Sequence, residues 1–338
     1  MGRLPDARYF RKAAGWATAI LLIAGFWAPV RAADDWNGFD VSFSLVPRDQ
    51  ILRGGPPKDG IPALTYPPVR PADRAGDLKA DDWVVGVRIG AEARAYPLRI
   101  LVWHEAVNDT LGGVPILVTY CPLCNSALVF ERHVGGQVRE FGVSGLLYNS
   151  NLLLYDRQPT PSQESLWSQV MMRAVTGPAA RAGWKLTLVP AEMLPWGDWK
   201  RRYPQTTVLS FQTGHGRNYY QDPYRRYHLF RDQVLFPVWL RRPKPKGVSL
   251  KDMVVVVQAD SALRAYRFED VKRQTQRTGS LEDRLGSVRV RLTYIEKGRW
   301  VRVESPDEPD RPLPVAYMYW FALASMLPDV EVYAPGSP

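Results

Sequence analysis

The sequence contains very little cysteine: 2 residues among 338, and both lie in one motif, Cys121-Pro122-Leu123-Cys124. Exported proteins that depend on a disulfide framework carry several cysteines spread along the chain, so this composition excludes such a framework. A single C-x-x-C pair is typical of a redox-active dithiol, a small structural disulfide or half of a metal site. The residues leave these three alternatives open.

Several catalytic motifs are also absent. The sequence has no glycine-rich phosphate-binding loop and no serine nucleophile elbow. His104-Glu105-x-x-Asn108 resembles a zinc-protease motif but has asparagine where the second histidine ligand would stand. Asn125 follows the second cysteine where covalent haem attachment requires histidine, so a c-type haem site is not expected.

The first 32 residues have the pattern of a signal peptide. A basic start is followed by an apolar run over residues 13–30 and by the small residues Ala32 and Ala33. We predict cleavage after Ala32 or Ala33 and a periplasmic location. The alternative is retention as a membrane anchor facing the periplasm, because about 18 apolar residues is the lower limit for a span.

The charge outside the first 32 residues says little about the partners of the protein. Residues 1–32 carry five Lys or Arg against one Asp, so the net charge of +10 falls to +6 without them. The basic run at 241–246 alternates with proline, which predicts a solvated linker over residues 236–247. No nucleic acid is expected as a partner of an exported chain.

An internal match predicts two related halves. Residues 83–96 align with 253–266, and each segment has the pattern of a β-hairpin with its turn near Gly90 or Asp260. Further on, a Trp-x7-Pro-x3-Val pattern at Trp196 recurs at Trp320, which predicts a helix, a turn and a short strand each time. We predict a β-rich α+β fold of antiparallel strands with a few helices, built from two half-repeats: residues 33–235 and a shortened 248–338.

The two copies differ by an insert that carries the unusual residues. The offset between them is 170 residues at the first match and 124 at the second, so the second copy lacks 46 residues. The missing part belongs to the stretch between Tyr96 and Trp196, and this stretch contains both cysteines. Function is therefore expected in the insert and scaffold in the shared parts.

Within the insert, Pro97 and the pair Gly112-Gly113 predict a helix over residues 98–111. On that helix His104 and Asn108 would share one stripe, and Glu105 and Asp109 the next. The alternative is a semi-buried histidine with both acids facing solvent.

The following run over residues 114–120 predicts a buried strand that ends at Cys121. Residues 125–134 then predict a second strand and a hairpin turn at Gly135-Gly136. A thioredoxin fold would place a helix there, so that fold is not expected.

Further polar residues surround the cysteines in sequence. Four clusters are expected to hydrogen-bond a thiolate, a histidine or a substrate: Ser144-Gly145, Asn149-Ser150-Asn151, Tyr155-Asp156-Arg157 and Ser165-Leu-Trp-Ser-Gln169. The expected cofactor-binding residues are Asn108, Asp109, Asn125, Ser144, Asn149 and Asp156. His215, on a glycine-flanked loop, is either a surface histidine or a distant metal ligand.

These residues together resemble a known family. The ordered motifs are Asp59-Gly-Ile-Pro, Arg94-Ala-Tyr-Pro-Leu, His104-Glu-x-x-Asn-Asp, Thr119-Tyr-Cys-Pro-Leu-Cys-Asn-Ser, Phe141-Gly-Val-Ser-Gly, Tyr155-Asp-Arg and Ser165-Leu-Trp-Ser-Gln. In that order they resemble the bacterial domain-of-unknown-function family 3179, over residues 50–333. The resemblance implies an exported or membrane-anchored bacterial protein and no settled activity. Arg267 stands where the family's parallel motif would have proline.

Two classes of function follow. In the first, Cys121, Cys124, His104 and Glu105 are catalytic in thiol-disulfide exchange, or Cys121, Cys124, His104 and His215 bind copper or zinc. The partner would be a small molecule, a metal ion or a thiol-disulfide partner, with membrane contact only through a retained anchor.

In the second class the protein is a non-catalytic scaffold. Cys121-Cys124 would be a static disulfide, and a surface around Trp167, Tyr219 and Tyr224 would hold a glycan or peptide. A hydrolase built from His104 and Glu105 is a third, weaker alternative.

Overall fold

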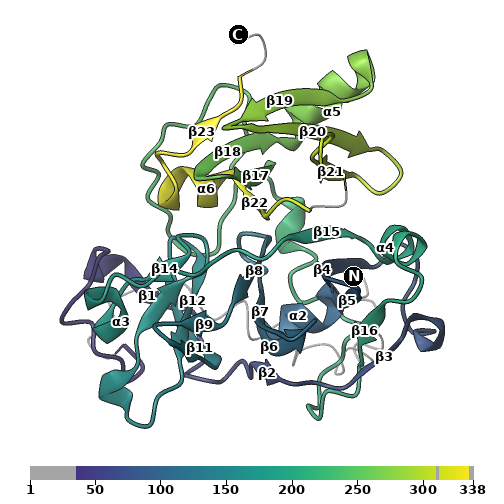
Figure 1. Ribbon diagram of the computed structural model, residues 1–338. Coiled ribbons are helices and arrows are strands. Elements are labelled where there is room, and N and C mark those ends of the chain that lie inside the picture. The colour runs from purple at the N-terminus through teal and green to yellow at the C-terminus, as the bar shows by residue number, and fades with distance from the viewer. Residues whose placement is uncertain (1–35, 310–311, 335–338) are drawn as a thin grey trace, which may run out of the picture. The chain divides into compact units, whose positions relative to one another are not determined.

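An eight-stranded sheet organises the fold in the computed structural model, which describes residues 36–309 and 312–334 (Figure 1). The predicted signal peptide lies outside these residues. Neighbouring strands are antiparallel except for the pairs β2–β6 and β18–β23. The strand order is β2 (Leu64–Thr65), β6 (Ala106–Leu111), β7 (Val114–Cys121), β8 (Ser126–Glu131), β22 (Val315–Tyr319), β17 (Met253–Ala259), β18 (Ala262–Arg267) and β23 (Glu331–Val332).

This sheet is buried on both faces. Along β7, Leu117 and Cys121 belong to one hydrophobic core, whereas Val118 and Tyr120 belong to a second core on the opposite face. Side chains alternate between faces along a strand, so a strand covered on both sides is apolar throughout. The predicted strand over 114–120 is thereby confirmed.

Two five-stranded sheets cover much of the central eight-stranded sheet. The first, which shares the core of Leu117 and Cys121, has the order β1 (Ile51–Arg53), β11 (Phe141–Tyr148), β12 (Asn151–Asp156), β13 (Leu166–Ser168) and β14 (Arg173–Ala174). The second has the order β15 (Ala191–Pro195), β4 (Trp83–Ile89), β5 (Glu92–Pro97), β16 (Thr207–Leu209) and β3 (Val69–Pro71).

Smaller elements complete the described chain. A three-stranded sheet and a hairpin contain β19 (Leu281–Leu285), β20 (Val288–Ile295), β21 (Trp300–Glu304), β9 (His133–Val134) and β10 (Gln137–Val138). The helices are α2 (Leu98–His104), α3 (Gly177–Arg181), α4 (Trp196–Arg202), α5 (Phe268–Thr278) and α6 (Trp320–Met326). None of the helices in the described segments has the length and apolar character that crossing a membrane requires.

The helix predicted over residues 98–111 is wrong in its second half. Helix α2 ends at His104, Glu105 takes a left-handed conformation with φ of 59°, and β6 follows. Gly112 and Gly113, with φ of 54° and 77°, form the turn of the β6–β7 hairpin. Two adjacent glycines at positive φ suit a two-residue hairpin turn as well as a helix end, and pairing with β7 selects the strand.

The two halves have the same strand arrangement. The orders β15-β4-β5-β16 and β22-β17-β18-β23 both contain two antiparallel pairs followed by one parallel pair. In Figure 1 the second set is coloured green to yellow and carries α6 between β22 and β23. The two predicted hairpins and both helix-strand units are confirmed, whereas their origin by duplication stays a prediction.

The predicted boundary between the halves is not a break in the sheet. Residues 236–247 contain neither strand nor helix. Strand β8 of the first half nevertheless pairs with β22 of the second, at Ala127 and Tyr317. The domain boundaries therefore remain a prediction from sequence, while the central sheet runs through both halves.

Corresponding positions carry the same buried cluster. In the first half Asp109 binds Arg94 at 2.6 Å and the Tyr96 hydroxyl at 2.8 Å. In the second half Asp283 binds Arg264 and Tyr266 in the same way. The first cluster is more buried, with side-chain exposures of 14% and 6% for its ion pair against 20% and 15%.

We expect Asp109→Ala to destabilise the protein by about 3–5 kcal/mol, because the Arg94 guanidinium loses its carboxylate partner and the buried Tyr96 hydroxyl loses its acceptor. The matched variant Asp283→Ala should cost less, about 1.5–3 kcal/mol, since Arg264 retains Glu331 as a partner. Urea denaturation of both variants measures the difference. Equal losses would contradict the burial argument.

Candidate functional site

The two cysteines lie at the turn between β7 and β8. Cys121 ends β7 opposite Ser126, and Cys124 sits in the turn, which closes through Asn125 at a φ of 46°. Both thiols are free, with exposures of 1% for Cys121 and 0% for Cys124. The turn thus holds a pair of buried cysteines that are not joined to each other.

A polar network surrounds the Cys124 sulfur. Asn151 Nδ2 donates to Sγ at 3.1 Å, and Ser126 Oγ lies 3.0 Å from the same sulfur. Gln169 Oε1 accepts from Ser126 Oγ at 2.6 Å and from Asn151 Nδ2 at 2.8 Å. The single Ser126 proton can therefore turn toward Gln169 or toward the sulfur, while Asn151 has one N–H for each.

The network makes the two cysteines unequal. Burial alone would raise the pKa of Cys124, but hydrogen bonds from Cys121, Ser126 and Asn151 outweigh it and lower that pKa. Burial, together with the hydrogen bond to Cys124, holds the pKa of Cys121 well above its ordinary value. Cys124 is consequently the more acidic thiol of the pair, and Cys121 donates a hydrogen bond to it.

Glu105 places a carboxyl beside this pair. Its left-handed backbone turns the chain from α2 into β6, and the residue is 6% exposed. No other side chain in the described residues hydrogen-bonds or ion-pairs with this carboxyl. Burial first, and then the charge of Cys121, raise the pKa of Glu105 well above its ordinary value. Glu105 is thus a buried acid whose charge interacts with Cys121.

Both ring nitrogens of His104 have hydrogen-bond partners within the protein. Its Nδ1 lies 2.7 Å from Pro62 O and its Nε2 2.7 Å from the Tyr219 hydroxyl, and burial lowers its pKa to about 4. The His215 ring is 5.1 Å from the His104 ring. Among the described residues no three His, Cys, Asp or Glu side chains converge in a way that could hold a metal ion. The predicted four-ligand set of two cysteines and two histidines is therefore not assembled, because both His104 nitrogens face other partners.

Most of the expected cofactor-binding residues form hydrogen bonds within the fold. Asn108 joins β6 to β11 by two bonds of 2.8 Å with the backbone of Phe141. Asp109 holds Arg94 and Tyr96, and Ser144 donates to the Leu153 carbonyl. The remaining two bind backbone or side-chain donors: Asn149 accepts from Trp239 N, and Asp156 accepts from Arg139, Ser165 N and Trp167.

The network around Cys124 was partly visible in sequence. Asn151 and Gln169 lie in polar clusters expected to hydrogen-bond a thiolate, and Asn151 does so. The sequence analysis did not predict that Ser126 belongs to this network. Its hydroxyl, two residues after the second cysteine, is a local signal that could have indicated it. Residues 224–246 also contribute, because Tyr227 donates to Leu123 O at 2.7 Å and Ser150 donates to Phe236 O at 2.7 Å. No local sequence pattern predicts these two hydrogen bonds, because each joins residues about a hundred positions apart.

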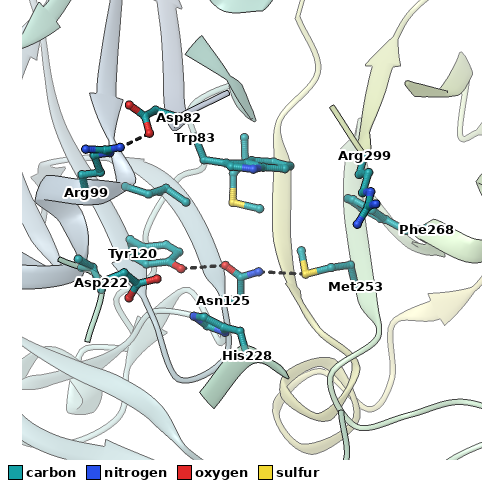
Figure 2. A pocket seen from close by; sticks show the side chains of 13 residues that line it. Asp82, Trp83, Arg99, Tyr120, Asn125, Asp222, His228, Met253, Phe268 and Arg299 are labelled. Atoms are coloured by element: carbon teal, nitrogen blue, oxygen red, sulfur yellow. Dashed lines mark hydrogen bonds and ion pairs between the residues drawn. The ribbon is translucent and has the colours of Figure 1, made fainter. Parts of the chain in front are cut away.

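A cavity of about 400 Å³ opens on the other side of the turn (Figure 2). Tyr120 donates to Asn125 Oδ1 at 2.9 Å, and Asn125 Nδ2 points at Met253 Sδ at 3.3 Å. Asn125, one of the expected cofactor-binding residues, thus lines this cavity. Figure 2 shows His228 and Asp222 on the same side of the cavity as Asn125, with Arg299 and Phe268 on the opposite side. His228, which the sequence did not single out, bonds Tyr319 through Nδ1 at 2.8 Å.

The predicted aromatic surface is not exposed. Trp167 is fully buried against Phe141, with ring centroids 5.5 Å apart, and Tyr219 is 4% exposed. Only Tyr224 of the three lies partly at the surface. A glycan or peptide platform at Trp167 and Tyr219 is therefore excluded, because their rings are core residues.

The fold and the site together define a β-rich α+β protein with a buried Cys-x-x-Cys pair in a central sheet. A family model described as "Protein of unknown function (DUF3179)" matches residues 58–319. The chain belongs to this family, as its ordered motifs indicated. No curated protein and no solved structure matches the chain.

Proposed function

We propose that the protein is an exported thiol-disulfide protein in which Cys121 and Cys124 interconvert between dithiol and disulfide. The observation that carries this proposal is the asymmetry of the pair. Cys124 receives hydrogen bonds that favour its thiolate, and Cys121 is a protonated thiol beside the carboxyl of Glu105. A thiolate is the nucleophile in disulfide exchange, and the second thiol must lose its proton to complete it.

The proposed reaction proceeds in two steps with a partner disulfide. The Cys124 thiolate attacks one sulfur of that disulfide, which forms a mixed disulfide and releases the first partner thiol. The ionised form of Glu105 accepts the proton of Cys121, and Cys121 then attacks the Cys124 sulfur and closes the Cys121-Cys124 disulfide. The second partner sulfur leaves as a thiolate, takes that proton from Glu105 and departs as a thiol. The protein pair loses two electrons and the partner disulfide gains them.

Access to the pair requires movement. Both sulfurs are buried, and residues 224–246 are bonded to the turns on either side of them, at Leu123 and Ser150. Exchange with a disulfide would therefore need this segment to move away from the cysteines. Because it contains no strand, it moves without breaking a sheet.

Of the two soft metals expected from the sequence, copper and zinc, only copper as Cu(I) remains part of the proposal. Two thiolates without a third protein ligand suit Cu(I), whereas structural zinc takes four ligands. Elemental analysis of the purified protein, beside a Cys121→Ser, Cys124→Ser double variant, separates the two uses. Stoichiometric copper that disappears in the double variant would favour metal binding.

The direct test is a redox equilibrium. We expect the purified protein, in mixtures of reduced and oxidised dithiothreitol, to convert completely between dithiol and disulfide, as measured by alkylation and mass spectrometry. Asn151→Ala should raise the Cys124 pKa in a thiolate absorbance titration, because it removes the N–H donor. Asn108→Ala is the matched control, since Asn108 is as buried as Asn151 but contacts neither sulfur.

Thiols that stay reduced throughout would refute the redox proposal. A disulfide that forms but leaves the pKa of Cys124 insensitive to Asn151 would favour the static, structural alternative.

A further inference from the structure

The connection between β16 and β17 is long and almost without regular structure. Across residues 210–252 the one regular element is a single 3-10 turn, Tyr227–Leu229. Connections of this length inside a folded protein are uncommon and are usually functional. We call residues 224–246 the strap.

The strap is anchored on its inner side. Val234, Phe236 and Val238 pack partly buried against the core that contains the cysteines. Backbone groups of the strap bond to the Asn149-Ser150 turn and to Ala324 O. The strap therefore has a defined inner face, and its alternate residues point outward.

The outer side is apolar as well. Large hydrophobic side chains are exposed at five strap positions: Leu229 73%, Phe230 45%, Leu235 49%, Trp239 36% and Leu240 38%. These are half of the ten exposed large hydrophobic residues in the described chain. An extended segment packed on one side normally carries polar residues on its solvent side. This concentration marks a surface that something else covers.

The strap also carries the positive charge of the protein. It contains seven Lys or Arg and one Asp, a net charge of +6, which equals the net charge of the whole chain after residue 32. Five of these cations form no ion pair within the described residues: Arg225, Arg226, Arg241, Arg242 and Lys246. Of these, Arg242 donates to the carbonyls of Pro328 and Val330. The rest of the chain after residue 32 is neutral in sum.

We propose that the strap docks on the surface of an anionic phospholipid bilayer. Exposed Leu, Phe and Trp side chains enter the interface between headgroups and acyl chains, while flanking Arg and Lys bind lipid phosphates. A second copy of this chain is a poorer occupant, because a two-fold contact would bring two +6 segments together. An acidic soluble partner would explain the charge but not five exposed hydrophobic side chains.

Vesicle sedimentation tests the proposal with residues 33–338, a compact unit that contains all three hydrophobic cores. We expect binding to phosphatidylglycerol-containing vesicles and little binding to pure phosphatidylcholine, with weaker binding at high salt. Leu235→Ser with Trp239→Ser should lower binding at least 10-fold, since both side chains point outward. Replacing Arg225, Arg226, Arg241 and Lys246 by Gln should lower it by about 100-fold or more.

Matched controls separate the strap from general effects. Lys79, Lys185, Arg277 and Lys297 are exposed cations outside the strap, and their replacement by Gln removes the same charge. Leu45→Ser with Val138→Ser removes two exposed hydrophobic residues elsewhere. Both control variants should bind vesicles nearly as the parent does.

Three results would overturn the proposal. One is equal binding to neutral and anionic vesicles, and another is equal loss in the strap and control variants. The third is a dimer in light scattering that Leu235→Ser with Trp239→Ser abolishes, without any vesicle binding by the parent. The Cys121→Ser, Cys124→Ser variant should still bind vesicles, so failure of the thiol proposal is distinguishable from failure of this one.

Discussion

Replacing Glu105 with glutamine is expected to stabilise the protein at neutral and alkaline pH while it slows proton exchange at Cys121. The wild-type carboxyl is buried without a cation, and its pKa is raised, so the folded state favours its neutral form. Stability from that neutral form is complete below the unfolded pKa and is lost as pH rises through the folded pKa. Glutamine cannot ionise, so the variant should gain about 1–3 kcal/mol at high pH.

The gain in stability should come with a loss in thiol chemistry. Under the proposed reaction, the ionised form of Glu105 accepts the proton of Cys121, and glutamine has no such form. We expect a slower closing of the Cys121-Cys124 disulfide from the mixed disulfide, with at least a 10-fold lower rate in stopped-flow oxidation. A residue that lowers stability and raises reactivity behaves as a functional group does.

Glu164→Gln is the matched control for Glu105→Gln. Glu164 is equally buried, with 6% exposure, but it is paired with Lys58. Its replacement should destabilise the protein, because the lysine loses its partner. If both variants changed stability in the same direction, or if Glu105→Gln left the oxidation rate unchanged, the assignment of Glu105 would be wrong.

The second large effect is acid destabilisation through His104. The ring is fully buried, and burial lowers its pKa from 6.5 to about 4. The unfolded chain therefore binds a proton between these values while the folded protein does not, so stability is complete above pH 6.5 and falls toward pH 4. A shift of this size corresponds to about 3 kcal/mol.

Urea denaturation at several pH values between 4 and 7 measures this effect. His104→Gln keeps a donor for the Pro62 carbonyl but does not titrate, so its stability should change less over this range than that of the wild type. His133, which is exposed, provides the control His133→Gln, which should leave the pH dependence unchanged. An identical pH dependence in wild type and His104→Gln would contradict the prediction. Glu105 works in the opposite direction over part of this range, so the two single variants are needed to separate them.

The sequence by itself determined the family, the β-rich class and several elements. The run over 114–120 is apolar at every position but one because β7 is buried on both faces, and that property is local. The hairpins at Gly90 and Asp260 follow from alternation and turn residues within a few positions. Patterns of this kind need no knowledge of what lies across the fold.

Only the tertiary structure decided the helix boundary and the site. Gly112-Gly113 suits two backbone outcomes, and pairing of β6 with β7 chose between them. That choice placed Asn108 and Asp109 on β6 instead of on a helix with His104, and it put Glu105 in a left-handed conformation between α2 and β6. The N–H donor that lowers the pKa of Cys124 comes from Asn151, which is 27 residues away in the sequence. The two ring nitrogens of His104 form hydrogen bonds with the Pro62 carbonyl and the Tyr219 hydroxyl. Hydrogen bonds between distant segments depend on how sheets pack, and that packing leaves no periodic signal in the chain.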